Sequence, residues 1–235
     1  MTATPRGQLA FALPPLVALG RDDLMVGPSN RDAVALVDGW RRWPANRLAL
    51  VGPRGSGKTH LAHVWAAEAG GTVRPAAGLA PDDAPALAEA PLALDDVDRA
   101  LAAGHVSEEA LFHVWNAAAR SGFPLLLTGE APPADWPVHL PDLASRLASL
   151  TPARIGPPDD ALLSVLLVKL FADRQVAVRP ALVGWLLLRI ERTHEAAADT
   201  VARLDAAALA QGRPVDVGLA REVLGEGLDS AGPPS

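Results

Sequence analysis

Residues 52–59 read Gly52-Pro53-Arg54-Gly55-Ser56-Gly57-Lys58-Thr59. They fit the pattern of a phosphate-binding loop, in which a glycine and four further residues precede Gly-Lys-Ser/Thr. Residues 48–51 are apolar or small, as in a buried parallel strand, and residues 60–67 have the pattern of a helix. The alternative is a glycine-rich turn with a chance Lys-Thr pair. Strand, loop and helix together favour the nucleotide site.

The loop residues have distinct expected roles toward ATP or ADP with Mg²⁺. Glycines let the backbone aim successive N–H groups at phosphates, and the following helix adds its positive end. Lys58 would reach the β and γ oxygens, and the hydroxyl of Thr59 would bind Mg²⁺. The expected nucleotide contacts from the loop are Gly52, Gly55, Ser56, Gly57, Lys58 and Thr59.

The composition and net charge of the chain limit the kinds of partner and compartment that we expect. A formal net charge of −6 over 235 residues argues against a chain-wide basic surface, so any contact with DNA should be local or indirect. The absence of cysteine excludes disulfides and cysteine-ligated metals, which fits a reducing cytoplasm. No signal peptide is recognisable, and no uncharged run reaches the roughly 18 residues of a spanning helix. We therefore expect a soluble, cytoplasmic protein without a membrane partner.

Two carboxylates follow the apolar residues 91–94, which read as a second buried strand. At the end of such a strand, beside a phosphate loop, one carboxylate can hold Mg²⁺ and the next can orient or deprotonate the attacking water. Asp95 takes the first role and Asp96 the second. The alternative is an acidic start of a helix that Asp98 would cap.

A third buried strand at residues 123–130 places Thr128 and Glu130 where a γ-phosphate could be sensed. Between the second and third strands, residues 107–120 open with a capping serine and continue as an amphipathic helix. Residues 141–147 predict a short helix that carries one exposed arginine, Arg146. Upstream, Ser29 or Asn30 is placed to cap a helix that extends through about residue 43.

The strands stop after residues 155–158, whose Gly-Pro-Pro sequence predicts a hinge. The expected fold is α/β, a phosphate-loop core with a parallel, doubly wound sheet and a small all-helical lid. The expected domains are a tail at 1–15, the core at 16–156, the lid at 157–225 and a disordered end at 226–235. Four lid helices are expected, at residues 159–174, 180–192, 194–211 and 217–224.

The N-terminal tail contains a candidate peptide ligand. Leu9, Phe11 and Leu13 alternate along one apolar edge, and Gln8 precedes them. The pattern resembles the short motif by which bacterial proteins dock into the DNA polymerase sliding clamp, with apolar anchors in a groove and a glutamine that fixes the register. The alternative is a frayed N-terminal strand.

Five segments resemble signatures of one family, in the family's order: residues 26–30, 57–61, 94–97, 111–116 and 127–133. The family is the DnaA-related AAA+ ATPases, and the resemblance is greatest to the shortened Hda (HdaA) type, regulatory inactivators of the replication initiator DnaA. It covers about residues 24–224 and implies the same ATPase core and helical lid. An initiator would continue into a helix-turn-helix domain, whereas this sequence ends at Ser235.

The resemblance also implies site residues and partners. It adds Asn30 to the nucleotide contacts and makes Arg146 an arginine finger that acts on the nucleotide of a neighbouring DnaA subunit. Where the lid of the family presents an arginine to the γ-phosphate, this chain has Glu195, and a carboxylate repels phosphates. Either Arg192, one turn earlier, substitutes, or the protein holds ADP better than ATP, or binding is weak.

The implied function is a clamp-bound regulator that promotes hydrolysis of DnaA-bound ATP, with the sliding clamp and DnaA as partners and little ATPase activity of its own. The resemblance also allows the chain to form a homodimer or a higher homo-oligomer. Two alternatives remain, an initiator-like or helicase-loader-like ATPase and a non-hydrolysing adaptor between the clamp and a partner. A helicase loader that binds single-stranded DNA is expected to have a basic groove with aromatic residues. The aromatic content of 4% and the net negative charge do not favour such a groove.

Overall fold

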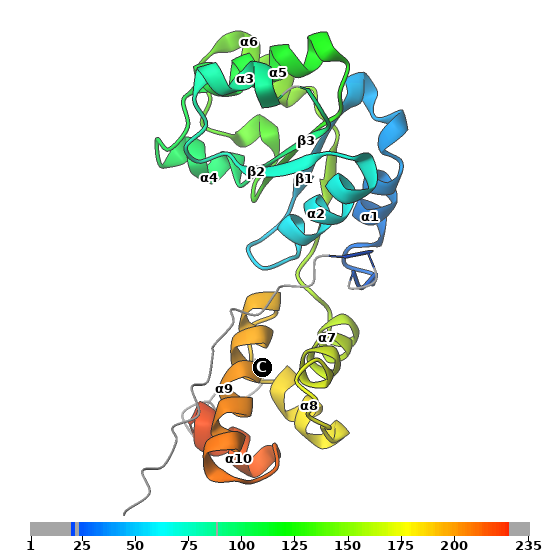
Figure 1. The fold of residues 1–235 in the computed structure, drawn as a ribbon, viewed down its shortest axis with the longest axis vertical. Coiled ribbons are helices and arrows are strands. Elements are labelled where there is room, and N and C mark those ends of the chain that lie inside the picture. The colour runs from blue at the N-terminus through cyan, green and yellow to red at the C-terminus, as the bar shows by residue number, and fades with distance from the viewer. Residues whose placement is uncertain (1–19, 22–23, 88, 226–235) are drawn as a thin grey trace, which may run out of the picture.

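The structure is a computed structural model that describes residues 20–21, 24–87 and 89–225. A sheet flanked by helices forms the upper unit in Figure 1, and a helical unit lies below it. The predicted clamp motif, Gln8, Leu9, Phe11 and Leu13, lies outside the described residues.

Five parallel strands form the sheet in the order β2-β3-β4-β1-β5. Their bounds are β1 Arg47–Val51, β2 Thr72–Pro75, β3 Leu92–Asp95, β4 Leu125–Gly129 and β5 Pro152–Arg154. Because all strands are parallel, the phosphate loop after β1 and the polar residues that end β3 and β4 meet at one edge of the sheet. The strand order therefore assembles the predicted site.

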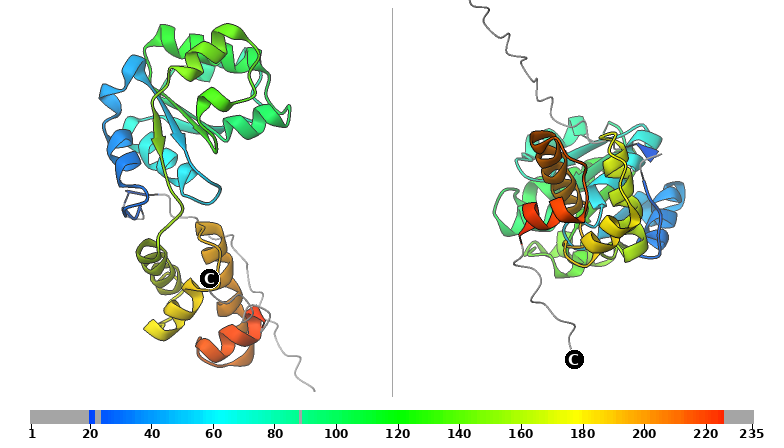
Figure 2. Two further views of the ribbon diagram at one scale, coloured as in Figure 1. Left: turned by 180° about the vertical axis from the view of Figure 1, so that it is seen from behind. Right: turned by 90° about the horizontal axis from the view of Figure 1, so that it is seen from below.

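Helices cover both faces of the sheet (Figures 1 and 2). One face packs against α1 Arg31–Asp38 and α2 Lys58–Ala69. The other packs against α3 Ala84–Leu87, α4 Val97–Ala102, α5 Glu108–Ser121 and α6 Pro141–Ala148. Alternate strand residues serve the two faces: in β4, Leu125 and Leu127 join one apolar cluster and Leu126 joins the other.

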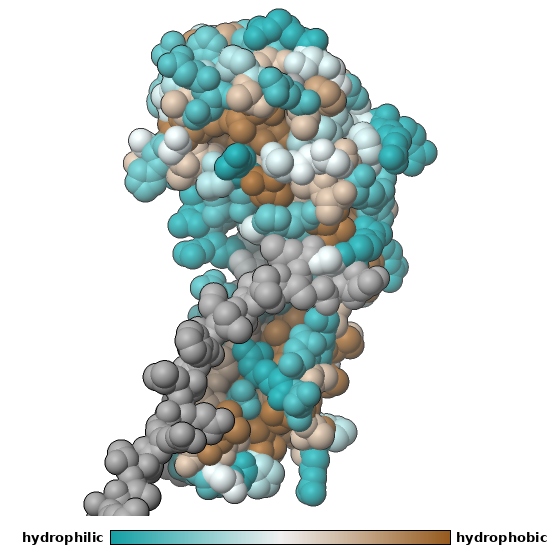
Figure 3. Space-filling model, viewed as in Figure 1, coloured by the Kyte–Doolittle hydropathy of each residue, from teal (hydrophilic) through white to brown (hydrophobic). Residues whose placement is uncertain are grey.

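The lid consists of α7 Asp160–Ala172, α8 Pro180–Leu187, α9 His194–Gln211 and α10 Val217–Leu224. It has an apolar cluster of its own, in which Leu163, Leu167 and Phe171 repeat every four residues along α7. Figure 3 shows apolar surface interleaved with hydrophilic surface over both units on one face of the molecule. No helix of the described residues is both long enough and apolar enough to span a membrane.

Three local expectations need correction. The helix expected to reach residue 43 ends at Asp38, where Gly39 is its C-cap. A separate turn follows at residues 40–42, and Trp43 is extended and stacks on Trp65 with ring centroids 5.3 Å apart. Asn30 does not cap α1 with its side chain, since its Oδ1 accepts from Gly27 N. The helix expected to reach residue 192 ends at Leu187, and the next residues turn so that Thr193 Oγ1 accepts from Ala196 N and caps α9.

Candidate nucleotide site

The phosphate loop joins β1 to α2 and leaves no room for side chains at two glycines. A Cβ on Gly52 would lie 2.2 Å from the carbonyl oxygen of Ile155. Gly55 has a φ of +67°, and a Cβ there would lie 2.4 Å from the Cβ of Thr193. The loop therefore contacts both Ile155, which follows β5, and the lid.

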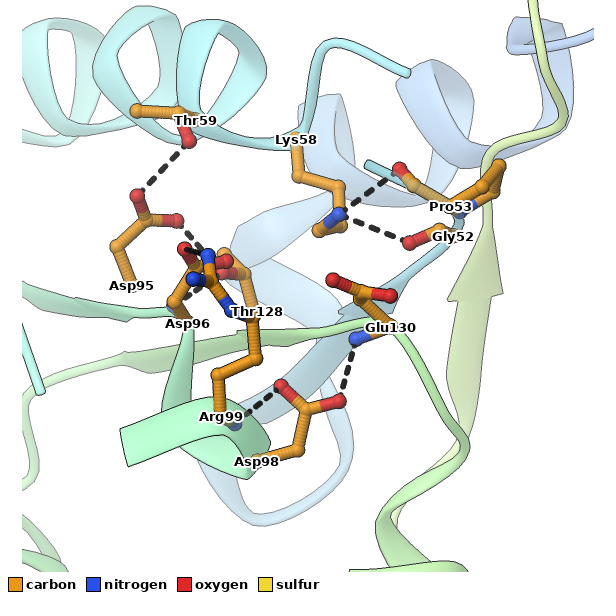
Figure 4. A network of polar contacts seen from close by, with 10 residues as sticks. All are labelled: Gly52, Pro53, Lys58, Thr59, Asp95, Asp96, Asp98, Arg99, Thr128 and Glu130. Atoms are coloured by element: carbon orange, nitrogen blue, oxygen red, sulfur yellow. Dashed lines mark hydrogen bonds and ion pairs between the residues drawn. The ribbon is translucent and has the colours of Figure 1, made fainter. Parts of the chain in front are cut away.

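Lys58 is the first residue of α2 and is 5% exposed. Its Nζ donates to the carbonyl oxygens of Gly52 at 2.8 Å and Pro53 at 3.0 Å (Figure 4). The ammonium is thus held inside the loop that it would serve. A phosphate oxygen entering the loop would offer it an anionic acceptor, which makes a stronger hydrogen bond than a carbonyl does.

Asp95, at the end of β3, accepts hydrogen bonds from two threonines (Figure 4). Thr59 Oγ1 donates to its Oδ2 at 2.8 Å, and Thr128 Oγ1 donates to its Oδ1 at 2.6 Å. Thr128 is fully buried and also accepts from the backbone N of Asp96 at 2.9 Å. The start of α2 and the ends of β3 and β4 are therefore connected through one carboxylate.

The residues fit a nucleotide with Mg²⁺ better than a metal bound by protein alone. Among the described residues, no group of three or more His, Cys, Asp or Glu is placed to hold a metal ion. Mg²⁺ is usually bound through one or two carboxylates together with phosphate oxygens. Thr59 and Asp95 offer oxygen ligands of that kind, at hydrogen-bond distance from each other.

Asp96 and Asp98 lie on either side of the start of α4 and have different partners. Asp96 has a φ of +55°, and its Oδ2 accepts from Arg99 Nη1 at 3.0 Å. Asp98 is buried, and its carboxylate accepts from the backbone N of Arg99, Glu130 and Ala131 at 2.8, 2.6 and 3.1 Å. Asp98 is therefore not the helix cap that the alternative interpretation assigned, since it ties the tip of β4, with Glu130, to α4.

Two pockets adjoin the loop. One, called the phosphate pocket, is lined mostly by polar residues: Arg54, Lys58, Thr59, His60, Asp96, Arg99, His194 and Glu195. The other is mostly apolar and is lined by Leu24, Met25, Leu61, Ile155, Leu162, Leu166 and Leu170 together with Asn30, Ser56 and Lys169. An apolar pocket beside a phosphate pocket suits a base attached to a polyphosphate.

Two polar residues of the apolar pocket differ in how their side chains are satisfied. Asn30 lines the pocket, but its Nδ2 donates to Met25 O at 2.8 Å while its Oδ1 accepts from Gly27 N. The amide of Asn30 thereby shapes the wall of the pocket. Ser56 Oγ is buried without a hydrogen-bond partner among the described residues, which leaves it available to a ligand.

The lid contributes His194 and Glu195, from the first turn of α9, to the phosphate pocket. Burial lowers the pKa of His194 below its ordinary value, and the positive charges of His60 and Lys169 lower it further. Sequence reasoning did not single out His194. Arg192, expected at the nucleotide, forms an ion pair with Asp160 of α7 at 2.5 Å.

Arg146 lies on α6, away from both pocket linings given above. Its guanidinium donates to Asp142 at 3.1 and 2.8 Å and to Asn116 Oδ1 at 2.8 Å, and it lies over the ring of Phe112. Arg146 therefore forms an ion pair with Asp142, one turn earlier on the same helix. This ion pair holds the guanidinium in one place, with the side chain 34% exposed.

Solved structures of replication initiation proteins and of a branch migration motor have a similar arrangement of sheet and helices. Domain III of the *Thermotoga maritima* replication initiation protein DnaA matches with a TM-score of 0.74 and 19% identity, over 90% of this chain and 97% of that domain. The fold is that of an AAA+ P-loop ATPase. No model of a known protein family matches the sequence.

Two further AAA+ structures are similar over smaller shares of their own length. AMPPCP-bound DnaA from *Aquifex aeolicus* matches with a TM-score of 0.60 and 17% identity, over 77% of this chain and 63% of that one. The RuvB Holliday junction branch migration motor of *Thermotoga maritima* also has a TM-score of 0.60 and 17% identity, over 76% of this chain and 60% of that one. The AAA+ fold thus occurs in both initiators and motors, so it does not decide between these functions.

Proposed function

We propose that this chain is a DnaA-related AAA+ regulator of the Hda type. It binds adenine nucleotide with Mg²⁺ and, docked on the sliding clamp, promotes hydrolysis of DnaA-bound ATP, so that chromosome replication is not re-initiated. The observation that carries the nucleotide part is the contact of Thr59 and Thr128 with Asp95 beside the phosphate loop. The regulatory part rests on the family resemblance and on Arg146.

At the chain's own site, each residue has a task that its contacts support. The backbone of residues 52–57 and Lys58 bind phosphates, while Thr59 and Asp95 would hold Mg²⁺. The metal would neutralise charge on the phosphate oxygens. Asp96 would take a proton from the attacking water, and Asp98 keeps Glu130 beside the site.

Arg146 supports an action on a second protein. A guanidinium delivered across a subunit interface stabilises the charge that spreads over the transferring phosphoryl oxygens. Arg146 is fixed by Asp142 and Asn116 and is separate from the pockets of its own chain. This placement suits a group presented to the nucleotide of DnaA.

The second candidate is an adaptor that binds the clamp and a partner without turnover. It is favoured by Glu195, whose carboxylate lines the phosphate pocket, and by Arg192, which pairs with Asp160. A carboxylate at this place weakens the attraction of the pocket for a terminal phosphate.

The test is a reconstituted reaction that contains DnaA loaded with radiolabelled ATP, the sliding clamp on DNA and the purified full chain. We expect hydrolysis of the DnaA-bound ATP to accelerate only when both the chain and the loaded clamp are present. Acceleration without the clamp would remove the clamp from the proposal. No acceleration under any condition, with clamp and DnaA both bound by the chain, would favour the adaptor.

A further inference from the structure

Arg99 lies on α4, one turn after Asp96, which is the carboxylate assigned to water activation. Its Nη1 is 3.0 Å from Asp96 Oδ2, and the side chains are 50% and 42% exposed. Both residues line the phosphate pocket. Figure 4 shows their side chains beside each other. Neither the phosphate-loop pattern nor the proposed function gives Arg99 a role.

The backbones of the two residues are held in place, so the pairing does not depend on the side chains alone. The backbone N of Asp96 donates to Thr128 Oγ1, and that of Arg99 donates to Asp98 Oδ1. Asp96 also adopts a left-handed conformation, with a φ of +55°, which is costly for a residue with a side chain. The junction of β3 and α4 thus aims both charged groups at the same pocket.

We propose that Arg99 is a positioning residue that restrains ATP hydrolysis at the chain's own site by holding Asp96 in this ion pair. The inference rests on the proposed nucleotide site. In the reaction, the oxygen of water bonds to the γ-phosphorus, and the bond from this phosphorus to the β–γ bridging oxygen breaks. The bonding electrons stay with ADP, and a proton of the water passes to Asp96 and then to the released phosphate.

The restraint arises because Arg99 and the attacking water both donate to the same carboxylate oxygen of Asp96. While Asp96 Oδ2 accepts from Arg99, it accepts less readily from water, so the ion pair has to loosen before the proton moves. Exposed ion pairs are weak, which bounds the effect: the pair can slow the reaction by about 1.4- to 5-fold. Arg99 is therefore a restraint of modest size, and the experiment has to resolve a change of that size.

The test uses the full chain and measures two quantities separately. Single-turnover hydrolysis of radiolabelled ATP gives the rate at the site, and titration with a fluorescent ATP analogue gives nucleotide affinity. Arg99→Gln should hydrolyse ATP about 1.4- to 5-fold faster than the unaltered chain, with similar affinity for the analogue. Arg99→Lys, which keeps the positive charge and N–H donors for the single contact with Asp96, should stay near the unaltered rate.

Two further variants separate the ion pair from general effects. Arg120→Gln removes the same charge from an exposed position near the C-terminal end of α5 and should leave the rate unchanged. In an Asp96→Asn background, Arg99→Gln should no longer accelerate hydrolysis, because the carboxylate that it frees is absent. A purely structural role of Arg99 in α4 would not depend on Asp96 in this way.

The proposal is overturned if Arg99→Gln binds the analogue and hydrolyses ATP at the unaltered rate. It is also overturned if neither Arg99→Gln nor the unaltered chain hydrolyses ATP at a detectable rate. A slower Arg99→Gln with intact affinity would also overturn it, since Arg99 would then assist the reaction by contacting the phosphate. Failure of the unaltered chain to bind the analogue would be a different result. It would overturn the nucleotide site itself, and the restraint with it.

Discussion

The backbone N–H of His194 donates a hydrogen bond to the carbonyl oxygen of Gly55 at 3.1 Å. The bond joins the first residue of α9 to the phosphate loop. Thr193 lies beside it, in the space that a side chain on Gly55 would need. The lid thus contacts the loop directly, so a substitution in one should affect the conformation or stability of the other.

Gly55→Ala should lower the free energy of unfolding by more than backbone strain alone would. The alanine would have to adopt a φ of +67° and place its Cβ 2.4 Å from that of Thr193. Left-handed backbone costs about 1–2 kcal/mol for an alanine, and the clash adds to this. Gly70→Ala is the matched control, since Gly70 lies in the same sheet-containing unit as Gly55 and has a φ of +71° with nothing within 4 Å of its Cβ. Equal losses of unfolding free energy in urea would show that the lid moves aside at no cost.

Lys58→Ala should lose most of its nucleotide binding and keep its fold. Hydrogen bonds to charged groups are worth about 1.5–3 kcal/mol, so ADP affinity should fall about 10- to 100-fold. Calorimetric titration with ADP and Mg²⁺ measures the loss, and circular dichroism checks the fold. Unchanged affinity in a folded variant would remove Lys58 from the site.

The stability of the protein should fall with decreasing pH through His194. The pKa of His194 in the folded state lies below the ordinary value of 6.5, because of burial and the charges of His60 and Lys169. The unfolded chain therefore binds more protons, so the contribution of His194 is complete above about pH 6.5 and is lost as the pH falls below it. His194→Gln should flatten the dependence of unfolding free energy on pH in this window. His113→Gln, at an exposed position on α5, is the control, and equal slopes in the two variants would contradict the assignment.

Deletion of residues 1–13 should abolish co-elution with the sliding clamp and leave thermal stability nearly unchanged. The tail motif is expected to bind through apolar anchors in a groove of the clamp and not through the core. Substitution of Gln8, Leu9, Phe11 and Leu13 by alanine in the full chain should have the same effect. A truncated chain that still elutes with the clamp would show that another surface binds it.

Arg146→Ala should keep its own nucleotide, its clamp binding and its melting temperature, yet lose stimulation of hydrolysis of DnaA-bound ATP. Fingers of this kind are worth on the order of 10³- to 10⁵-fold in small GTPases, whereas a surface ion pair with Asp142 is worth only about 0.3–0.5 kcal/mol. Arg146→Lys should fail nearly as badly, because a point charge does not replace the planar fork. Asp142→Asn removes the ion pair and leaves the guanidinium, so it should retain stimulation. Full stimulation by Arg146→Ala in the reconstituted reaction would leave only the ion pair.

The parts of the fold that sequence predicts well are those with strong local signals. The phosphate loop has a fixed spacing of residues, and β1, β3 and β4 each contain at least three consecutive apolar residues, as expected for strands buried on both faces. Helix α9 has a threonine at one end and a glycine at the other, and its bounds are as predicted.

The parts that sequence does not predict depend on contacts between distant residues. Strand β5 has three residues, begins with a proline and is defined only by its pairing with β1. Asp98 has the pattern of a helix cap, but the backbone of Glu130 and Ala131, 32 and 33 positions away, determines its role. The ion pair of Arg192 with Asp160 likewise joins the connection between α8 and α9 to α7, a contact that no local pattern reveals.

The separate apolar cluster of the lid affects how the protein unfolds. Because Leu167, Phe171 and their neighbours pack among themselves, α7 to α10 do not depend on the sheet for a hydrophobic interior. Units with interiors of their own open as distinct cooperative blocks, so amide protons in the lid should exchange with solvent at a free energy different from that of β1 and β4. A single melting temperature would then describe the core and the lid only as an average.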